Sequence, residues 1–230
     1  MKTRQEERRE QTEAEIKALA WQLMEEQGPA DLSLREISRQ MRMSSAAIYR
    51  YYENRNALLD ALTMDAYLSQ SDDLEAAYTA GTGQDVFERI AGLAEAYRTW
   101  ALQNAVKYLL VYAVPVPGYS PDWNVLLASA TQSLGPLIRL VVEADAAGRV
   151  KENMLPQSTS AELLDHLRQV GLQRGYELSS RALFAAFAGW TAVHGMVSLE
   201  LSGQLMVFGP YSAEFFTAEV RRYIESIRKE

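Results

Sequence analysis

Residues 32–62 read LSLREISRQMRMSSAAIYRYYENRNALLDAL, and this stretch decides the fold class. Ser33 and Glu36 have the spacing of a capping box, in which a hydroxyl and a carboxylate each bind a free backbone N–H at a helix start. A second N-cap residue, Ser44, follows after about two helical turns and a short break. The stretch therefore predicts two short helices joined by a tight turn, which is helix-turn-helix geometry.

The second of these helices has two contrasting faces. Ile48 and Tyr52 lie together and are expected to pack inward, whereas Ala46, Tyr49 and Arg50 point the other way. Small side chains let a helix backbone approach the major groove, and a tyrosine hydroxyl or a guanidinium can bind a phosphate or a base edge. The alternative is an ordinary helical hairpin within a bundle.

The rest of the chain has helical rather than alternating periodicity, which predicts an all-α fold. We expect an N-terminal three-helix domain over residues 1–56, with a flexible arm over the first ten residues, and a larger helical bundle domain over 57–230. Breakers and caps place the other helices: a first one ending near Gly28, then Asn54 to Gly81, Val86 to Ala101, Ser120 to Ala147, Ala161 to Val170, Ser180 to Leu201, and a last one after Pro210.

Composition excludes several classes of protein. Hydrophobic residues make up 48% of the chain and charged residues 23%, which is ordinary globular usage. Cysteine is absent and there are two histidines, so thiolate metal sites and multi-histidine sites are excluded and no cofactor is expected. No nucleotide loop, nucleophile elbow or zinc-protease motif is present, so we expect no enzyme.

No apolar run follows the charged N-terminus, which indicates a cytoplasmic protein without a secretory signal. The uncharged stretch 182–199 touches the lower length limit of a membrane span, but its glycine and polar residues favour a buried core or interface helix. We expect no membrane association.

The net charge of −7 is unevenly distributed. Residues 1–60 hold 10 basic and 11 acidic side chains, whereas residues 61–230 hold 13 and 19. Within residues 31–56, five arginines face three acids, a local balance of +2. DNA binding depends on this local field, and the patch has the required sign.

The residues quoted above resemble the N-terminal domain of TetR-family transcriptional regulators. The match covers about residues 12–60 and rests on Ser33–Ile37, Met43-Ser44, Ile48–Tyr52, Asn54-Arg55 and Leu58-Leu59. The resemblance implies a homodimer that binds a double-stranded DNA operator and carries a variable helical domain for a small-molecule effector. It also implies the DNA-binding residues Ser33, Arg35, Ser44, Ser45, Ala46, Ala47, Tyr49, Arg50, Tyr51 and Arg55.

Three positions depart from the family pattern. Arg42 stands where the family usually has glycine, so a left-handed backbone there would cost about 1 kcal/mol or more, unless the turn is built differently. Arg55 replaces the usual lysine and keeps the positive charge needed at a phosphate. Tyr51 stands where histidine is common, which bears on base preference.

A second resemblance lies in the C-terminal half. Trp190, His194 and Gly195 look like the tryptophan-histidine-glycine helix of one subgroup of these regulators. The spacing places Trp190 and His194 on one helical face, where the histidine is either a hydrogen-bonded core residue or a ligand contact. The resemblance implies that this helix and the last one form the dimer interface, through Phe184, Val193, Val197, Phe216, Val220, Tyr223, Ile224 and Ile227.

Aromatic residues cluster in the same domain and can line a pocket for an apolar or aromatic effector. The candidates for ligand binding are Phe87, Tyr97, Trp100, Tyr108, Tyr112, Trp123, Phe187, Trp190 and His194. The alternative for each of them is simple core packing. We therefore predict a repressor that a small apolar or aromatic effector releases from a palindromic operator; the alternative is a helical ligand-binding or scaffolding protein without DNA binding.

Overall fold

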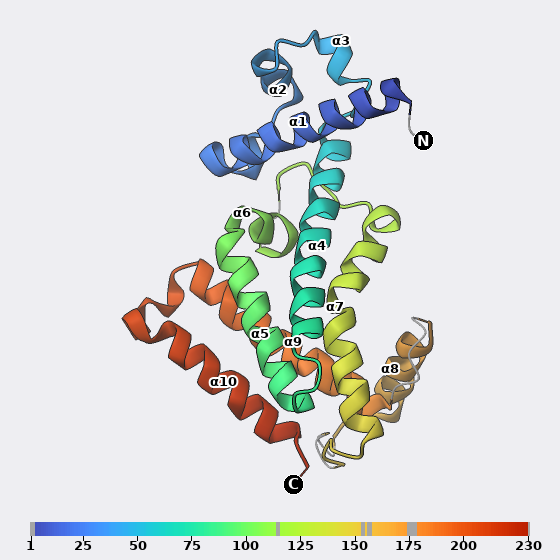
Figure 1. Cartoon of the computed structure of the whole chain (residues 1–230), viewed down its shortest axis with the longest axis vertical. Coiled ribbons are helices and arrows are strands. Elements are labelled where there is room, and N and C mark those ends of the chain that lie inside the picture. Colours follow the sequence, from blue (N-terminus) through green and yellow to red (C-terminus); the bar gives the residue numbers. More distant parts are fainter. Residues whose placement is uncertain (1–2, 114–115, 153–154, 156–157, 174–178, 230) are drawn as a thin grey trace. The chain divides into compact units, whose positions relative to one another are not determined.

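The computed structural model describes residues 3–113, 116–152, 155, 158–173 and 179–229 (Figure 1). Regular structure in these ranges is helical apart from one isolated β-bridge between Val150 and Arg228, which confirms the all-α class. The chain forms two compact units, one made of residues 1–69 and 104–132 and the other of 70–103 and 133–230. The first unit therefore contains more than the expected N-terminal domain over residues 1–56.

The first unit is built around the N-terminal helices. It contains α1 (Arg4–Gln27), α2 (Leu34–Gln40), α3 (Ser45–Ile48), the beginning of α4 (Arg55–Ala80), α6 (Ala105–Tyr108) and the first turns of α7 (Trp123–Ala146). A short 3-10 turn (Pro29–Asp31) joins α1 to α2, and a π-helical turn (Leu109–Ala113) follows α6.

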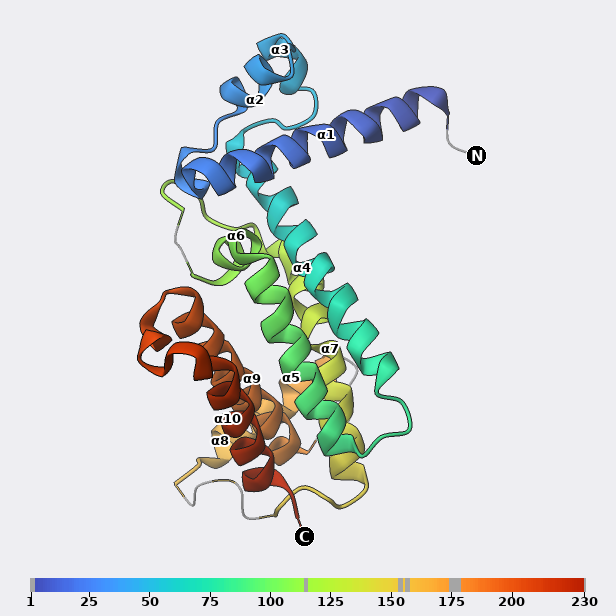
Figure 2. The ribbon, with the colours of Figure 1, turned by 60° about the vertical axis from the view of Figure 1, so that its left-hand side comes forward.

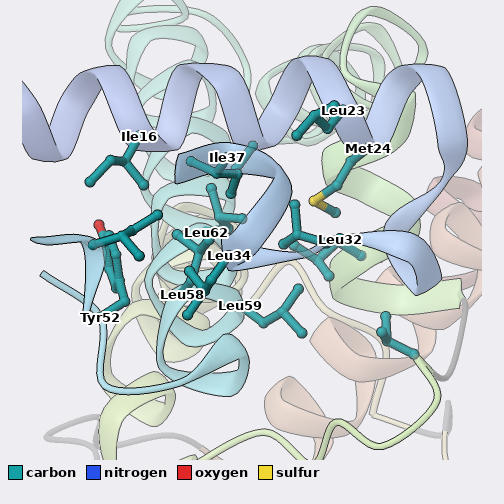
Figure 3. Packing of buried hydrophobic residues seen from close by; sticks show 14 residues of the cluster. Ile16, Leu23, Met24, Leu32, Leu34, Ile37, Tyr52, Leu58, Leu59 and Leu62 are labelled. Carbon is teal, nitrogen blue, oxygen red and sulfur yellow. The ribbon is translucent and has the colours of Figure 1, made fainter. Parts of the chain in front are cut away.

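One apolar core holds this unit together. Figure 3 shows side chains from α1, α2, α4 and the segment after α3 converging on it, among them Ile16, Met24, Ile37, Tyr52 and Leu59. Leu110 and Val116 are buried in the same cluster, which explains why residues 104–132 belong to this unit. Large core side chains of this kind each stabilise a fold by about 2–5 kcal/mol relative to alanine.

The chain is helical almost from its start. The Thr3 hydroxyl accepts a hydrogen bond from the Glu6 backbone N–H at 3.2 Å, and the Glu6 carboxylate accepts one from the Thr3 N–H at 2.7 Å. This reciprocal capping box satisfies two free donors and begins α1 at Arg4. Residues 4–10 of the predicted flexible arm are therefore helical, and residues 1–2 lie outside the described residues.

The predicted capping box of α2 is also wrong. Ser33 occupies the N-cap position, but its side chain makes no capping hydrogen bond. Glu36 instead accepts hydrogen bonds from the Arg39 guanidinium, at 2.9 Å to Nε, and from the Gln40 amide at 2.7 Å. The Glu36 carboxylate that a capping box needs at the Ser33 N–H is thus bound to Arg39 and Gln40.

The second unit is a helical bundle. It contains the remainder of α4 and α7 together with α5 (Val86–Gln103), α8 (Ala161–Gln173), α9 (Ser180–Leu201) and α10 (Ser212–Ile227). A 3-10 segment (Gln204–Tyr211) joins α9 to α10. Figure 2 shows α10 running beside α5 and α9, and α8 packs on α9.

Two helices, α7 and α9, are long and apolar enough by length and composition to cross a membrane. Both also pack inside the protein, as Leu126 and Leu140 of α7 and Ala182 and Val197 of α9 are fully buried. Apolar helices of this kind are also expected in the core of a bundle.

Candidate nucleic-acid interface and ligand cavity

Helix α3 ends at Ile48, and residues 49–51 form a turn, so the predicted second helix of the motif is shorter than expected. The two predicted faces are present on α3 and the turn that follows it. Ile48 is fully buried and Tyr52 is 8% exposed, so both pack inward as expected. Ala46, Tyr49 and Arg50 are exposed on the opposite side, with nearly half of the Tyr49 surface open to solvent. The exposed side thus combines one small side chain with two that can form hydrogen bonds.

The turn before α3 contains a strained residue. Arg42 has φ of +55°, the left-handed conformation expected at this position. The Met43 N–H then donates to the Ser38 carbonyl at 2.9 Å, and the Ser44 hydroxyl accepts from the Ala47 N–H at 3.2 Å. Ser44 is therefore the N-cap of α3, as predicted, and its hydroxyl has a structural role.

A polar hollow lies where the starts of α2 and α4 approach the end of α3. Ser33, Arg35, Tyr49 and Arg55 line it, together with Asn54 and two leucines. The structure thus brings together residues that were predicted separately to contact DNA. Tyr51 differs from them, because it is half-buried and the Arg9 guanidinium lies 5.8 Å from its ring centroid.

Arginines supply the positive charge of this surface. Arg35, Arg42 and Arg50 are exposed and form no ion pair within the described part of the chain. Arg39 is paired with Glu36, and hydrogen bonds from Arg39 and Gln40 lower the pKa of Glu36 to about 2. The three uncompensated arginines therefore carry the local field that favours DNA.

Arg55 has a different environment from the one predicted. Its guanidinium donates to the backbone carbonyls of Leu32 at 2.8 Å, Ala30 at 2.8 Å, Pro29 at 3.0 Å and Pro117 at 3.2 Å. A guanidinium has five N–H donors, so most of them already have partners in the protein. These bonds give Arg55 a structural role at the start of α4, and its contact with a DNA phosphate stays a prediction.

The second unit holds a narrow apolar cavity. Its volume is about 50 Å³ for the centres of water-sized spheres, within about 540 Å³ of empty space that includes open solvent. Its wall comes from α4, α5, α7, α9 and α10. Aliphatic side chains make up much of the wall, and Tyr97, Trp190 and Tyr223 supply aromatic rings. Among the residues that the structure describes, no lysine, arginine, aspartate or glutamate lines it. Such a wall suits an apolar ligand.

The Trp190–His194 pair lies at this cavity. The two rings stack with centroids 5.0 Å apart and planes 16° apart. The Tyr97 hydroxyl lies 2.9 Å from Nδ1 of His194, and burial lowers the pKa of His194 below its usual value. The imidazole is thus held neutral, and it connects two aromatic residues of the wall.

The other predicted ligand-binding residues lie elsewhere. Phe87 and Trp100 are buried outside the cavity wall, and Phe187 lines a separate small hollow. Tyr108, Tyr112 and Trp123 belong to the first unit, where the first two pack together with centroids 5.2 Å apart and Trp123 is 55% exposed. Sequence reasoning missed the aliphatic wall residues, namely Leu93, Leu134, Leu137 and Val193.

Most of the predicted dimer-interface residues are buried within a single copy of the chain, and their place in a dimer interface stays a prediction. Val197, Phe216, Val220, Ile224 and Ile227 are at most 4% exposed within a single copy, because α10 packs its apolar face on α5 and α9. Phe184, Val193 and Tyr223 are half-buried, and the last two line the cavity. Exposed apolar side chains of the second unit lie at Leu102, Leu163, Leu172, Leu199, Met206, Val207 and Tyr211, and the most exposed are Met206 and Val207.

A helix-turn-helix with an exposed basic face, followed by a helical domain with an apolar cavity, defines a DNA-binding transcriptional regulator. The chain belongs to the TetR family. The family model described as bacterial regulatory proteins, tetR family, matches residues 16–62. The model described as tetracyclin repressor-like, C-terminal domain, matches residues 90–223.

Similar proteins support the same assignment. The HTH-type transcriptional regulators Rv1816 of Mycobacterium tuberculosis and Mb1846 of Mycobacterium bovis are each 33% identical over 211 residues, covering 91% of this chain and 86% of theirs. The solved structure of the protein SCO4313 is 37% identical with a TM-score of 0.77, and covers 97% of this chain and 100% of that chain. A structure from Rhodococcus sp. RHA1 is 25% identical with a TM-score of 0.72, covering 94% and 95%.

Proposed function

We propose that this regulator is a cytoplasmic repressor that binds a palindromic operator as a homodimer and is released by a small apolar effector. The exposed face of α3 and of the turn after it, beside the hollow, carries the proposal. Tyr49 and Arg50 contact base edges or phosphates, with Ala46 allowing close approach of the helix. Ser33 and Arg35 bind phosphates from the start of α2.

The homodimer forms through the exposed apolar surface at the end of α9 and the segment that follows it. Met206 and Val207 are 80% and 85% exposed, and Tyr211 and Leu199 are 64% and 40% exposed. These residues lie close together in the sequence, and contiguous exposed apolar surface is typical of protein contacts. A two-fold dimer presents two copies of α3 to half-sites one or more helical turns apart.

Release by the effector is a shift between two populations of the dimer. A ligand in the cavity of the second unit favours the population whose α3 helices no longer match the half-site spacing. This requires only that the ligand binds that population more tightly than the DNA-bound one.

The experiment is selection of bound sequences from a random duplex library, followed by titration of the best site at several salt concentrations. An enriched palindrome and an affinity that falls steeply with salt, by a slope of about −0.9 per phosphate, would support the proposal. No enrichment from folded, dimeric protein, or a flat salt response, would favour a ligand-binding or scaffolding protein that does not bind DNA.

A further inference from the structure

A buried hydrogen-bond donor lies in the wall of the cavity. Trp190 lines the cavity, and its Nε1 atom is buried with no hydrogen-bond partner among the residues that the structure describes. Buried N–H groups nearly always have a partner, because an unmade bond costs the full desolvation of the group. A ligand oxygen in the cavity is a suitable partner for this N–H.

The indole of Trp190 is held in place. His194 stacks on it, and the Tyr97 hydroxyl in turn lies 2.9 Å from Nδ1 of His194. On α10, which forms another part of the cavity wall, the Tyr223 hydroxyl donates to the Ala185 carbonyl. These contacts give both tyrosine hydroxyls partners within the protein and pack the indole ring against His194.

The described residues of the cavity wall supply no charge to neutralise a ligand ion. The polar side chains of the wall besides the aromatic ones, Gln70 and Ser133, are an amide and a hydroxyl. His194 behind the wall is neutral near pH 7 because burial lowers its pKa. A carboxylate or ammonium group inside the cavity would lose its hydration without an opposite charge in return.

From these observations we infer that the cavity selects an uncharged, mainly hydrocarbon ligand carrying one carbonyl or ether oxygen. The Trp190 Nε1–H donates the hydrogen bond to that oxygen. This inference rests on the proposed effector-binding role of the cavity and adds the chemical class of the ligand.

The test is a set of probes that share one ring system: 2-acetylnaphthalene, 2-ethylnaphthalene and 2-naphthoate. Each is titrated into the full-length protein without DNA, and binding is followed by calorimetry. We expect the ketone to bind about tenfold more tightly than the hydrocarbon, which is the worth of one buried hydrogen bond. The carboxylate should bind far more weakly than either.

Trp190→Phe separates the hydrogen bond from the packing of the ring. This variant should weaken ketone binding about tenfold and leave hydrocarbon binding nearly unchanged, because phenylalanine lacks the N–H. The ratio of the ketone affinity to the hydrocarbon affinity is compared between the parent and the variant, which removes the packing effect that both probes share. Trp123→Phe, at a tryptophan that is 55% exposed, is the matched control and should change neither affinity. Ala94→Leu reduces the space in the cavity and should weaken binding of both neutral probes.

Several results would overturn the inference. Naphthoate binding as tightly as the ketone would contradict the preference for uncharged ligands, and an equal effect of Trp190→Phe on ketone and hydrocarbon would contradict the role of the N–H. Absence of binding by every probe would contradict the ligand class, and unchanged binding to Ala94→Leu would place the site elsewhere. Because no DNA is present, each of these failures is distinct from a failure of operator binding.

Discussion

The Nε atom of Arg55 donates a hydrogen bond to the carbonyl oxygen of Leu32 at 2.8 Å, joining the first turn of α4 to the residue that precedes the cap of α2. Other donors of the same guanidinium bind the short turn at Pro29 and the loop at Pro117. Next to it, the Asn56 amide donates to the Gly118 carbonyl at 3.3 Å. The start of α4 therefore fixes two loops of the first unit, one of which leads into the helix-turn-helix.

Arg55→Ala should lower the free energy of unfolding by about 2–3 kcal/mol, because partly buried carbonyls lose a charged donor. The free energy of unfolding of Arg55→Lys should lie between those of the parent and of Arg55→Ala, since an ammonium cannot reach all of the carbonyls. Urea unfolding measures both. Arg50→Ala, at an exposed arginine, should stay within about 0.5 kcal/mol of the parent. If Arg55→Ala kept full stability and lost only DNA affinity, Arg55 would be a phosphate contact after all.

Arg42→Gly should raise the free energy of unfolding by about 1 kcal/mol, because glycine adopts the φ of +55° without the strain of a side chain. Denaturant unfolding tests this directly. Gln40→Gly, at the last residue of α2, is a control in which glycine should destabilise by about 0.5–1 kcal/mol. An equal decrease in the free energy of unfolding of both variants would show that the left-handed turn carries no strain.

Gly189→Ala should destabilise the protein by about 1–3 kcal/mol. A Cβ atom at Gly189 would lie 2.7 Å from the Tyr223 ring, which the hydroxyl bond to Ala185 holds in place. Gly92 is the matched control, because a Cβ there has open space on an exposed helix surface, and alanine should stabilise α5 by about 0.5–1 kcal/mol. Thermal unfolding that showed the same gain in both variants would rule out close packing at Gly189.

His194 should make the protein less stable in mild acid. Burial lowers its pKa in the folded state below the usual 6.5, so the unfolded chain binds the proton more readily. The stabilising contribution of the neutral imidazole is present above pH 6.5 and is lost as the pH falls toward the pKa of His194 in the folded state. Between about pH 8 and about pH 5, the free energy of unfolding should decline less for His194→Gln than for the parent. His166→Gln, at an exposed histidine, should follow the parent; equal declines in all three would contradict the assignment.

Local features of the fold were predictable from the sequence because neighbours in the chain determine them. Ser44 caps α3, and Asn54 caps α4 by accepting from the Ala57 N–H at 3.0 Å. The inward face of α3 at Ile48 and Tyr52 follows from helical periodicity. The capping box predicted for Ser33 is absent, because Glu36 binds Arg39 and Gln40 one turn further on.

Features that depend on distant contacts were not predictable in the same way. Nothing near Arg55 in the sequence indicates carbonyl partners, which lie 23 to 62 residues away. Tyr97 and Trp190 line the cavity while Phe87 does not, although all three lie on apolar helices. Periodicity gives each helix an apolar face, but it does not say whether a neighbouring helix or an open space covers that face.

The most direct test of the central claim is the salt dependence of binding to the selected duplex, compared for the parent, Tyr49→Ala and Arg50→Ala by fluorescence anisotropy. Arg168→Ala, at an exposed arginine of α8, is the control for removal of one remote positive charge. We predict that Tyr49→Ala and Arg50→Ala each bind at least tenfold more weakly, and that Arg50→Ala lowers the salt slope by about 0.9 for each phosphate that the variant no longer binds. Unchanged affinity and slope in both of these variants, from dimeric protein, would contradict the claim that the exposed face of α3 and of the turn after it binds DNA.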